Sequence, residues 1–441
     1  MMTRHGCSDF TKGSRRPRLA RSGIAGAVAM VFGLSLSVGM APSVSAATSA
    51  TKSPIELGVQ VVQVPSLSGI NQNYQLPYKV LIDNLNAHGG ILGHPVEPVY
   101  YTVNLLSSET GAEIEQQMCT LWTQDHKVSA VLLNSSYTDL TLSCLNKADI
   151  FTLGVGGSTT QNGETAATYA DFPLYASAGR INFTRLGSVY INGLVASGFF
   201  NKNAKIGYLY MNTPAGLNAE KSIEKALRLH HLSITDSVAV PTDLGGTISA
   251  APNVILRFRT DGVTRVIDSL AGTMAFYMKD AQQQGYHPKY GLTTNDGLTS
   301  LTGQLKTDGI LSVPPAQLNG AVAIGWSPVF DINQAAPGPQ SKQCLNLLAA
   351  NGLSVQAFGL EMFTIDCDQV SIFEAAAKAV HGSFTGAAIM RGLEAVGDPP
   401  SVTVLGLDYT AKSRDGASVV ARLGFFSACT CFKYISKPYG A

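Results

Sequence analysis

Residues 74–102 read YQLPYKVLIDNLNAHGGILGHPVEPVYYT, and this stretch decides the fold class. Apolar side chains recur at helical spacing from Leu76 to Leu85. The pair Gly89-Gly90 then supplies the left-handed conformation with which helices commonly end. Residues 96–101 alternate as a strand does. The stretch therefore predicts a helix followed by a strand.

A second strand is expected just before this helix. Leu57, Val59 and Val61 alternate with smaller or polar residues within 56–64, and the polar turn Ser66–Gly69 leads into the helix. A strand, helix, strand unit of this length is right-handed, so its strands lie parallel. The polar turn then lies at the carboxyl edge of a sheet, where open α/β sheets bind ligands.

Composition indicates a large α/β protein with two domains. The 441 residues exceed one comfortable core, and charged residues make up only 14%. Without residues 1–46 the chain has 25 Lys and Arg against 29 Asp and Glu, a net charge of −4. This balance gives no reason to expect nucleic acid as a partner.

The first 46 residues are predicted to be an export signal. A basic stretch ends at Arg21, an apolar run extends over 23–41, and Val44-Ser45-Ala46 forms a small-x-small cleavage signal. An uncleaved membrane anchor is the alternative, and Arg15-Arg16 leaves twin-arginine export open beside the general route. The protein is therefore expected at the cell surface, in the periplasm or secreted.

Six cysteines follow the signal, in a compartment that permits disulfides. Sequence alone allows 15 pairings. Proximity favours Cys119 with Cys144, Cys344 with Cys367, and Cys429 with Cys431. A metal or redox dithiol at Cys429 and Cys431 is the alternative for the third pair, although no second CxxC accompanies it.

The rest of the chain alternates strands and helices in two series. Further strands are expected at 128–133, 150–153, 205–210, 233–240, 265–269, 289–293 and 309–313, with extended segments at 402–407 and 419–426. Helices are expected between them and at 364–379 and 385–395. Polar loops, including residues 134–137 and 154–159, follow the strands of the first series. This pattern predicts two parallel-sheet domains of similar design.

Asn86-Ala87-His88-Gly89-Gly90-Ile91-Leu92-Gly93 resembles the INAxGGIxG signature of type I periplasmic binding proteins, in the branch that includes leucine/isoleucine/valine receptors of ABC importers. Residues 205–226 and 281–293 resemble two later segments of that family. The resemblance covers most of 55–395. It implies two Rossmann-like lobes with parallel sheets, joined by a three-crossover hinge: lobe one from 54–173 plus 297–395, and lobe two from 174–296 plus 396–441.

The resemblance also implies a ligand site between the lobes. The family's ligand-binding positions fall on Tyr74, Ser135, Ser136, Gly157, Ser158, Thr159, Leu270 and Asp296. Hydroxyls and free amides would hold a carboxylate, Asp296 would pair with an ammonium, and Tyr74 would cover the side chain. A core position for Tyr74 and a turn-capping role for Asp296 are the alternatives.

Enzyme motifs are not evident in the sequence. It contains no G-x-S-x-G, H-E-x-x-H or Walker motif, and adjacent His230 and His231 lack a cluster of further ligands. No catalytic residue, metal or cofactor is therefore expected. We expect a receptor that captures a small amino acid or amide-like ligand between closing lobes and delivers it to an ABC transporter permease. An extracellular sensor without a transporter, or a secreted hydrolase, remains the alternative, and the sequence leaves the ligand open.

Overall fold

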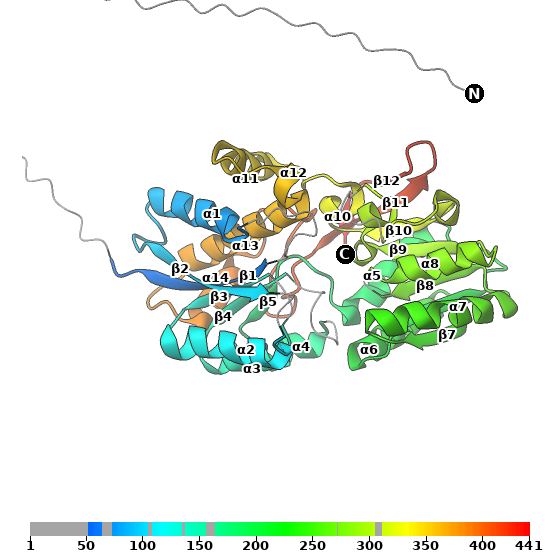
Figure 1. Cartoon of the computed structure of the whole chain (residues 1–441), viewed down its shortest axis with the longest axis horizontal. Coiled ribbons are helices and arrows are strands. Elements are labelled where there is room, and N and C mark those ends of the chain that lie inside the picture. Colours follow the sequence, from blue (N-terminus) through cyan, green and yellow to red (C-terminus); the bar gives the residue numbers. More distant parts are fainter. Residues whose placement is uncertain are drawn as a thin grey trace, which may run out of the picture. The chain divides into compact units, whose positions relative to one another are not determined.

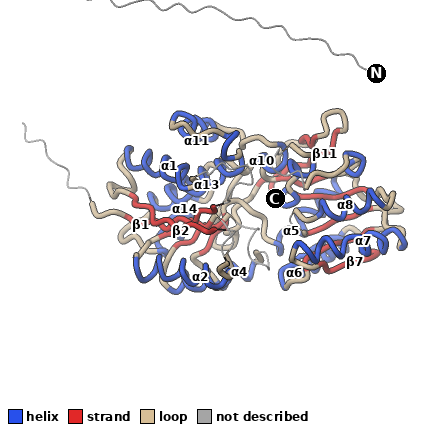
Figure 2. Tube along the Cα trace, viewed as in Figure 1, coloured by secondary structure: helices blue, strands red, loops and turns tan. Residues whose placement is uncertain are grey.

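The computed structural model describes residues 52–63, 73–104, 108–134, 137–155, 164–270, 272–304 and 311–441. Within these ranges the chain forms two sheets, flanked by helices and connected by three segments (Figures 1 and 2). The predicted α/β fold with parallel sheets is thereby confirmed.

The first sheet is parallel throughout, with the strand order β2-β1-β3-β4-β5. Its strands are β1 (Ile55–Gln63), β2 (Val96–Asn104), β3 (Ala130–Leu133), β4 (Phe151–Gly154) and β5 (Tyr175–Ser177). Its helices are α1 (Gln75–Ala87), α2 (Gly111–Thr120), the π-helix η1 (Leu121–Asp125), α3 (Asp139–Lys147), α4 (Ala166–Asp171), α11 (Pro339–Ala350), α12 (Val355–Phe358), α13 (Leu360–Lys378) and α14 (Gly386–Val396). Figure 1 shows α1 and α13 on one face of this sheet and α2 and α3 on the other.

The stretch that decides the fold has the predicted structure. Helix α1 buries Tyr78, Ile82 and Leu85 against the first sheet and ends at the predicted glycines. Gly90 has φ +64°, and a Cβ there would lie 2.0 Å from the carbonyl oxygen of His94. Only glycine fits this turn, which returns the chain directly to β2.

The second sheet has the strand order β12-β11-β10-β9-β8-β6-β7, and β13 pairs with β11. Its strands are β6 (Ile206–Met211), β7 (Ile234–Val240), β8 (Arg265–Ser269), β9 (Lys289–Thr293), β10 (Val322–Gly325), β11 (Val419–Phe426), β12 (Cys431–Tyr434) and β13 (Tyr439–Gly440). Strands β6 to β10 are parallel, whereas β11 to β13 pair antiparallel. Its helices are α5 (Phe183–Ala196), α6 (Pro214–Leu229), α7 (Leu244–Thr260), α8 (Met274–Gln283), η2 (Thr294–Asp296), α9 (Leu298–Leu301), η3 (Pro315–Leu318) and α10 (Pro328–Ile332).

The expected division places β5 in the wrong lobe, because β5 pairs with β4 of the first sheet. It is also wrong between Gly297 and Ile332. These residues do not return to the first sheet, because β10 pairs in parallel with β9 and extends the second sheet. Leu298, Leu301 and Leu318 are buried in the core of that sheet. We refer below to the first sheet and its helices as lobe one, and to the second sheet and its helices as lobe two.

Two expected extended segments are not strands. Residues 311–313 form a turn and coil, while 309–310 lie outside the described residues. Residues 402–407 form bends with one isolated bridge, between Leu407 and Ala417. These bends belong to a connection between the lobes, where no neighbouring strand extends a ladder.

Three crossovers connect the lobes: the first is 178–182, the second is 333–338 and the third is 397–418. The third hydrogen-bonds to the other two. These backbone bonds run from Ala417 N to Arg180 O (3.1 Å) and from Ala336 N to Val402 O (2.8 Å). The three segments therefore form one connected hinge.

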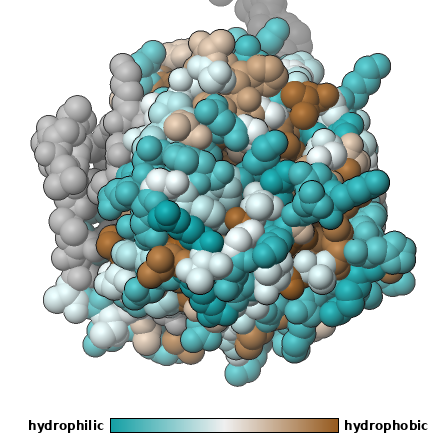
Figure 3. Space-filling model, turned by 90° about the vertical axis from the view of Figure 1, so that its right-hand side faces the viewer, coloured by the Kyte–Doolittle hydropathy of each residue, from teal (hydrophilic) through white to brown (hydrophobic). Residues whose placement is uncertain are grey.

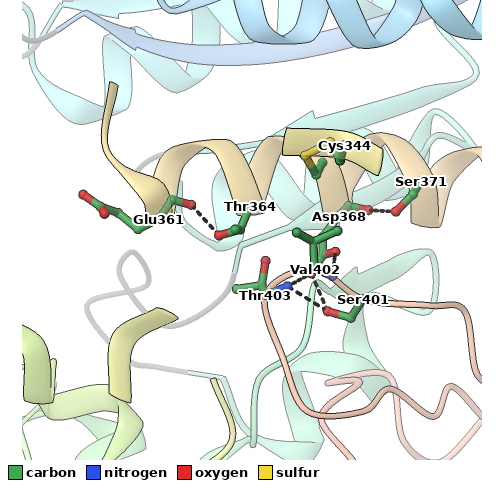
Figure 4. The surroundings of a disulfide bond; sticks show 9 residues. Cys344, Glu361, Thr364, Asp368, Ser371, Ser401, Val402 and Thr403 are labelled. Carbon is green, nitrogen blue, oxygen red and sulfur yellow. Dashed lines mark hydrogen bonds between the residues drawn. A yellow bond between two sulfur atoms is a disulfide. The ribbon is translucent and has the colours of Figure 1, made fainter. Parts of the chain in front are cut away.

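Two buried aspartates anchor the third crossover. Asp415 accepts hydrogen bonds from Asn182 and pairs with Arg185 at 3.0 Å. Asp368, on α13, accepts from Val402 N (2.6 Å) and from Ser401 Oγ (2.6 Å). Figure 4 shows α13 beside this segment. Each carboxylate replaces lost hydration with several donors, which fixes the position of the crossover.

The largest apolar core extends across both lobes. It contains the faces of α1, α5, α6 and α13, and a second core contains α7, α8 and the strands beneath them. Figure 3, which looks at the end of the molecule on the right of Figure 1, shows a largely hydrophilic face with separate hydrophobic spots. Spots of this kind are ordinary on protein surfaces. Among the described residues, no helix is both long and apolar enough to cross a membrane.

The six cysteines form the pairs that proximity favours: Cys119 with Cys144, Cys344 with Cys367, and Cys429 with Cys431. The first two pairs each join neighbouring helices of lobe one, α2 to α3 and α11 to α13. The third closes the turn between β11 and β12.

Candidate functional site

A small cavity lies where the three crossovers meet the two lobes. Its volume is about 10 Å³, room for roughly one water-sized group. It is lined by Val155, Ala178, Gly179, Arg180, Trp326, Ser327, Phe330, Ile365, Asp368, Thr403 and Val404. These residues come from lobe one, lobe two and the first and third crossovers, so the cavity wall changes when the lobes move.

Arg180 connects the lobes at this cavity. Its Nε donates to the carbonyl oxygen of Val155 in lobe one (2.8 Å), and Nη1 donates to Oδ1 of Asn295 in lobe two (3.4 Å). Its guanidinium carbon lies 5.7 Å from the ring centre of Phe330, in cation–π range. Burial lowers the pKa of Arg180 from its ordinary value, but an arginine remains charged in proteins.

The buried acid Glu164 acts on the charge of Arg180 and raises its pKa, but without a direct ion pair. Within the part of the chain that the structure describes, no acid forms an ion pair with Arg180. Arg185, five residues later, differs because it is paired with Asp415. A half-buried guanidinium with free N–H groups is suited to bind a carboxylate or another planar anion.

Two further donors at the cavity lack partners. The indole Nε1 of Trp326 and the hydroxyl Oγ1 of Thr403 are buried and have no hydrogen-bond partner among the described residues. Trp326 is fully buried at the end of β10. By contrast, the other tryptophan, Trp122, donates its indole N–H to the carbonyl oxygen of Val99 (3.1 Å). Buried donors without acceptors are rare and mark a place for a ligand or water.

Tyr74, predicted to cover a ligand, lies elsewhere. It is half-buried at the start of α1 and packs edge-on against Phe358, with ring centres 5.9 Å apart. It lines an open surface depression of about 320 Å³ with Gln63 and Thr102, and it does not line the cavity at Arg180.

Leu270 and Asp296 are inside lobe two. Leu270 is fully buried in its core. Asp296 is 2% exposed, and its Oδ2 accepts from the backbone N–H (2.6 Å) and hydroxyl (3.1 Å) of Thr293. The structure therefore gives Asp296 the capping role considered as the alternative, and neither residue presents its side chain to the cavity.

Asp296 also faces a second acid, Asp268. Asp268 Oδ1 accepts from Leu270 N (2.9 Å), while Asp268 Oδ2 and Asp296 Oδ1 have no hydrogen-bond donor among the described residues. Burial first, and then the neighbouring acid, raises the pKa of Asp268; burial also raises the pKa of Asp296. The pair therefore retains a proton between its oxygens far above the pH at which an exposed aspartate loses it.

The remaining predicted residues, Ser135, Ser136, Gly157, Ser158 and Thr159, lie outside the described residues and stay predictions. The described residues next to these loops, Val155 and Asn134, show where the loops begin. Val155 lines the cavity, and Asn134 belongs to a buried network in which its amide donates to Asp366 (2.9 Å) and to Tyr78 (3.0 Å). Burial raises the pKa of Asp366 to about 8.

Sequence reasoning missed Arg180, Trp326, Phe330 and Thr403. A signal for Arg180 exists: it is the one charged residue between Asp171 and Arg185, and it comes three residues after the end of β5. No comparable local signal marks Trp326 or Thr403, because their meeting depends on how the crossovers pack. Within the described ranges, no cluster of three His, Cys, Asp or Glu residues could hold a metal ion.

The family model for periplasmic binding proteins matches residues 72–418. The chain belongs to the periplasmic binding protein family. The two lobes and three crossovers of this binding protein agree with that membership. A search of curated protein sequences found no match.

Solved structures with this fold include several solute-binding proteins of ABC transporters. One from Rhodopseudomonas palustris HaA2, in complex with p-hydroxybenzoic acid, has a TM-score of 0.63 and 15% identity over 88% of this chain and 98% of its own. One from Thermus thermophilus with bound valine has a TM-score of 0.62 and 14% identity over 89% and 97%. One from Desulfitobacterium hafniense in complex with Leu has a TM-score of 0.59 and 12% identity over 87% and 100%. At these identities the likeness establishes the shared fold.

Proposed function

We propose that this binding protein is an extracytoplasmic receptor that captures a small carboxylate between its lobes and delivers it to an ABC importer. The observation that carries the proposal is Arg180, a charge with contacts to both lobes and no ion pair with an acid of the described residues. A ligand carboxylate would supply the missing partner through charge-assisted hydrogen bonds. No catalytic group is required for this role.

The ligands named for three neighbours support the same class. p-Hydroxybenzoate, valine and leucine differ in shape and in their other polar groups, but each carries one carboxylate. A guanidinium at the hinge would recognise this shared group, and the rest of the ligand would contact more variable surfaces.

Capture would follow from contacts in both lobes. A ligand held by Arg180 would lie near Asn295 and Phe330, which contact this side chain from lobe two, and contacts of the ligand with them would favour the closed arrangement. The permease would then bind the closed form of the receptor. A ligand with equal affinity for the open and closed forms would not change the equilibrium between them. Contacts between the ligand and lobe two are therefore essential to the mechanism.

The test is a thermal-shift and calorimetric screen of the chain from Ala47 onward against carboxylates, amides, sugars and polyamines. A ligand at 100 times its dissociation constant stabilises the folded protein by about 2.7 kcal/mol. We expect hits among carboxylates, recovered unchanged after binding. Recovery of an altered product would indicate the hydrolase alternative instead.

Arg180→Gln should then weaken the best ligand at least about 30-fold, because truncating one side of a buried charge pair costs about 2–5 kcal/mol. Arg228→Gln is the matched control, since that exposed arginine pairs with Glu224 on α6, away from the cavity. Equal affinities in Arg180→Gln and the control would contradict the role of Arg180.

A further inference from the structure

We infer that the site selects carboxylates without a neighbouring ammonium group, and that Trp326 and Thr403 are its specificity-determining donors. The inference rests on the proposed function and narrows its ligand class. It replaces the expectation of an amino acid, which required an acid at the site to hold the ammonium.

Three groups that line the cavity can donate hydrogen bonds, and of these the Thr403 hydroxyl can also accept. They are the guanidinium of Arg180, the indole N–H of Trp326 and the hydroxyl of Thr403. An indole N–H can only donate, so rotation cannot satisfy it, and the guanidinium likewise has no acceptor. One ligand carboxylate offers two oxygens with about four lone-pair directions, enough for three donors. The cavity volume of about 10 Å³ matches one such oxygen, with the rest of the ligand outside it.

A buried ammonium needs a carboxylate partner, and the carboxylate that lines the cavity is occupied. Asp368 is the acid among the described residues that line it. Its Oδ1 accepts from Val402 N (2.6 Å), and its Oδ2 accepts from Ser401 Oγ (2.6 Å) and Thr403 N (3.1 Å) (Figure 4). The carbonyl oxygen of Thr403 already accepts from Ser327 Oγ (2.8 Å). Removing a donor from Asp368 to admit an ammonium would release the third crossover.

Other buried acids are also occupied. Glu164, whose charge acts on Arg180, accepts from the hydroxyls of Tyr169 (2.6 Å) and Tyr175. Asp296 is enclosed in lobe two with Asp268. The predicted polar loops at 134–137 and 154–159 contain no acid by sequence, and neither do residues 160–163. After residue 51, the segments outside the described ranges contain one acid, Asp308. A buried ammonium without a carboxylate partner is strongly disfavoured.

Matched ligand pairs test the inference. Each pair is an amino acid and the same acid lacking its amino group: leucine with 4-methylpentanoate, and phenylalanine with 3-phenylpropanoate, together with 4-hydroxybenzoate. By calorimetry we expect the acids lacking the amino group to bind at least about 30-fold more tightly than their partners. Tighter binding of the amino acids would overturn the inference and leave the receptor function standing. Failure of every carboxylate, of either kind, would overturn both.

Donor-deleting variants test the named residues. Trp326→Phe and Thr403→Val each remove one donor and retain the shape, and each should weaken the best acid about 10-fold. Trp122→Phe is the matched control: it removes an indole N–H that is bonded to Val99, so it should lower the melting temperature without changing affinity. Wild-type affinity in both Trp326→Phe and Thr403→Val would overturn the assignment.

Discussion

The cavity at the crossovers and the acid pair of lobe two are both buried, and both contain polar atoms without partners, but the atoms differ in kind. Among the described residues at the cavity, the indole N–H of Trp326 is a donor without an acceptor, and the hydroxyl of Thr403, which can donate or accept, has no partner. In lobe two, Asp268 and Asp296 carry acceptors without donors.

This difference decides which region needs a ligand. A pair of carboxylic acids can satisfy its own hydrogen bonding by retaining a proton that one acid donates to the other. The raised pKa of both groups agrees with a retained proton. An indole N–H has no such option, because it can neither lose its proton nor accept one. The acid pair is therefore complete within lobe two, whereas in our proposal a ligand supplies the acceptor at the cavity.

The largest expected effect comes from removing the cap in lobe two. Asp296→Ala leaves the N–H and hydroxyl of Thr293 without their acceptor, and should lower the free energy of unfolding by about 2–3 kcal/mol. Denaturant titration measures this loss. Affinity for the best ligand in the folded variant should stay within twofold of wild type. A large loss of affinity at unchanged stability would show that Asp296 contacts the ligand after all.

The next effect is a pH dependence of stability. Because the folded state holds protons on Asp268 and Asp296 that the unfolded chain has lost, stability should fall as pH rises from about 4 through the raised folded values. Asp331, whose pKa burial raises to about 7, and Asp366, at about 8, act in the same direction. The protein should therefore melt at a higher temperature at pH 5 than at pH 8.

Asp268→Asn isolates the part of this dependence that the acid pair causes. The amide can donate to Asp296 at every pH, so the variant should lose at least about 1 kcal/mol of the wild-type change between pH 5 and pH 8. An identical pH profile in the variant would mean that the two acids do not share a proton.

The smallest effect concerns the unliganded cavity. Trp326→Phe removes a buried donor that has no partner in the described chain, so the free energy of unfolding without ligand should stay equal or rise by about 1 kcal/mol. Trp122→Phe should instead lower it by about the same amount. Comparable losses in both variants, measured by thermal unfolding, would indicate that the Trp326 indole is satisfied within the protein.

The sequence predicts most of the fold because its signals are local. Periodicity and the glycines at 89–90 define α1 and its turn to β2, and short separations identify the cysteine pairs. The segment from Gly297 to Ile332 was misassigned because pairing of β10 with β9 is a long-range choice. Periodicity does not show which sheet a strand joins.

The site was less predictable for the same reason. The family resemblance places Asp296 at a ligand-binding position. Its role in the structure depends on Asp268, which lies 28 residues earlier and interacts with it only in the folded protein. Arg180, Trp326 and Thr403 come from three distant parts of the chain and meet only where the crossovers meet. Such a site has no sequence spacing to recognise.

The most direct test is a crystal structure of the protein with its tightest-binding carboxylate. We predict a carboxylate oxygen within hydrogen-bonding distance, about 3 Å, of Trp326 Nε1 and of the Arg180 guanidinium. A carboxylate bound elsewhere, with water beside the Trp326 indole, would contradict the account.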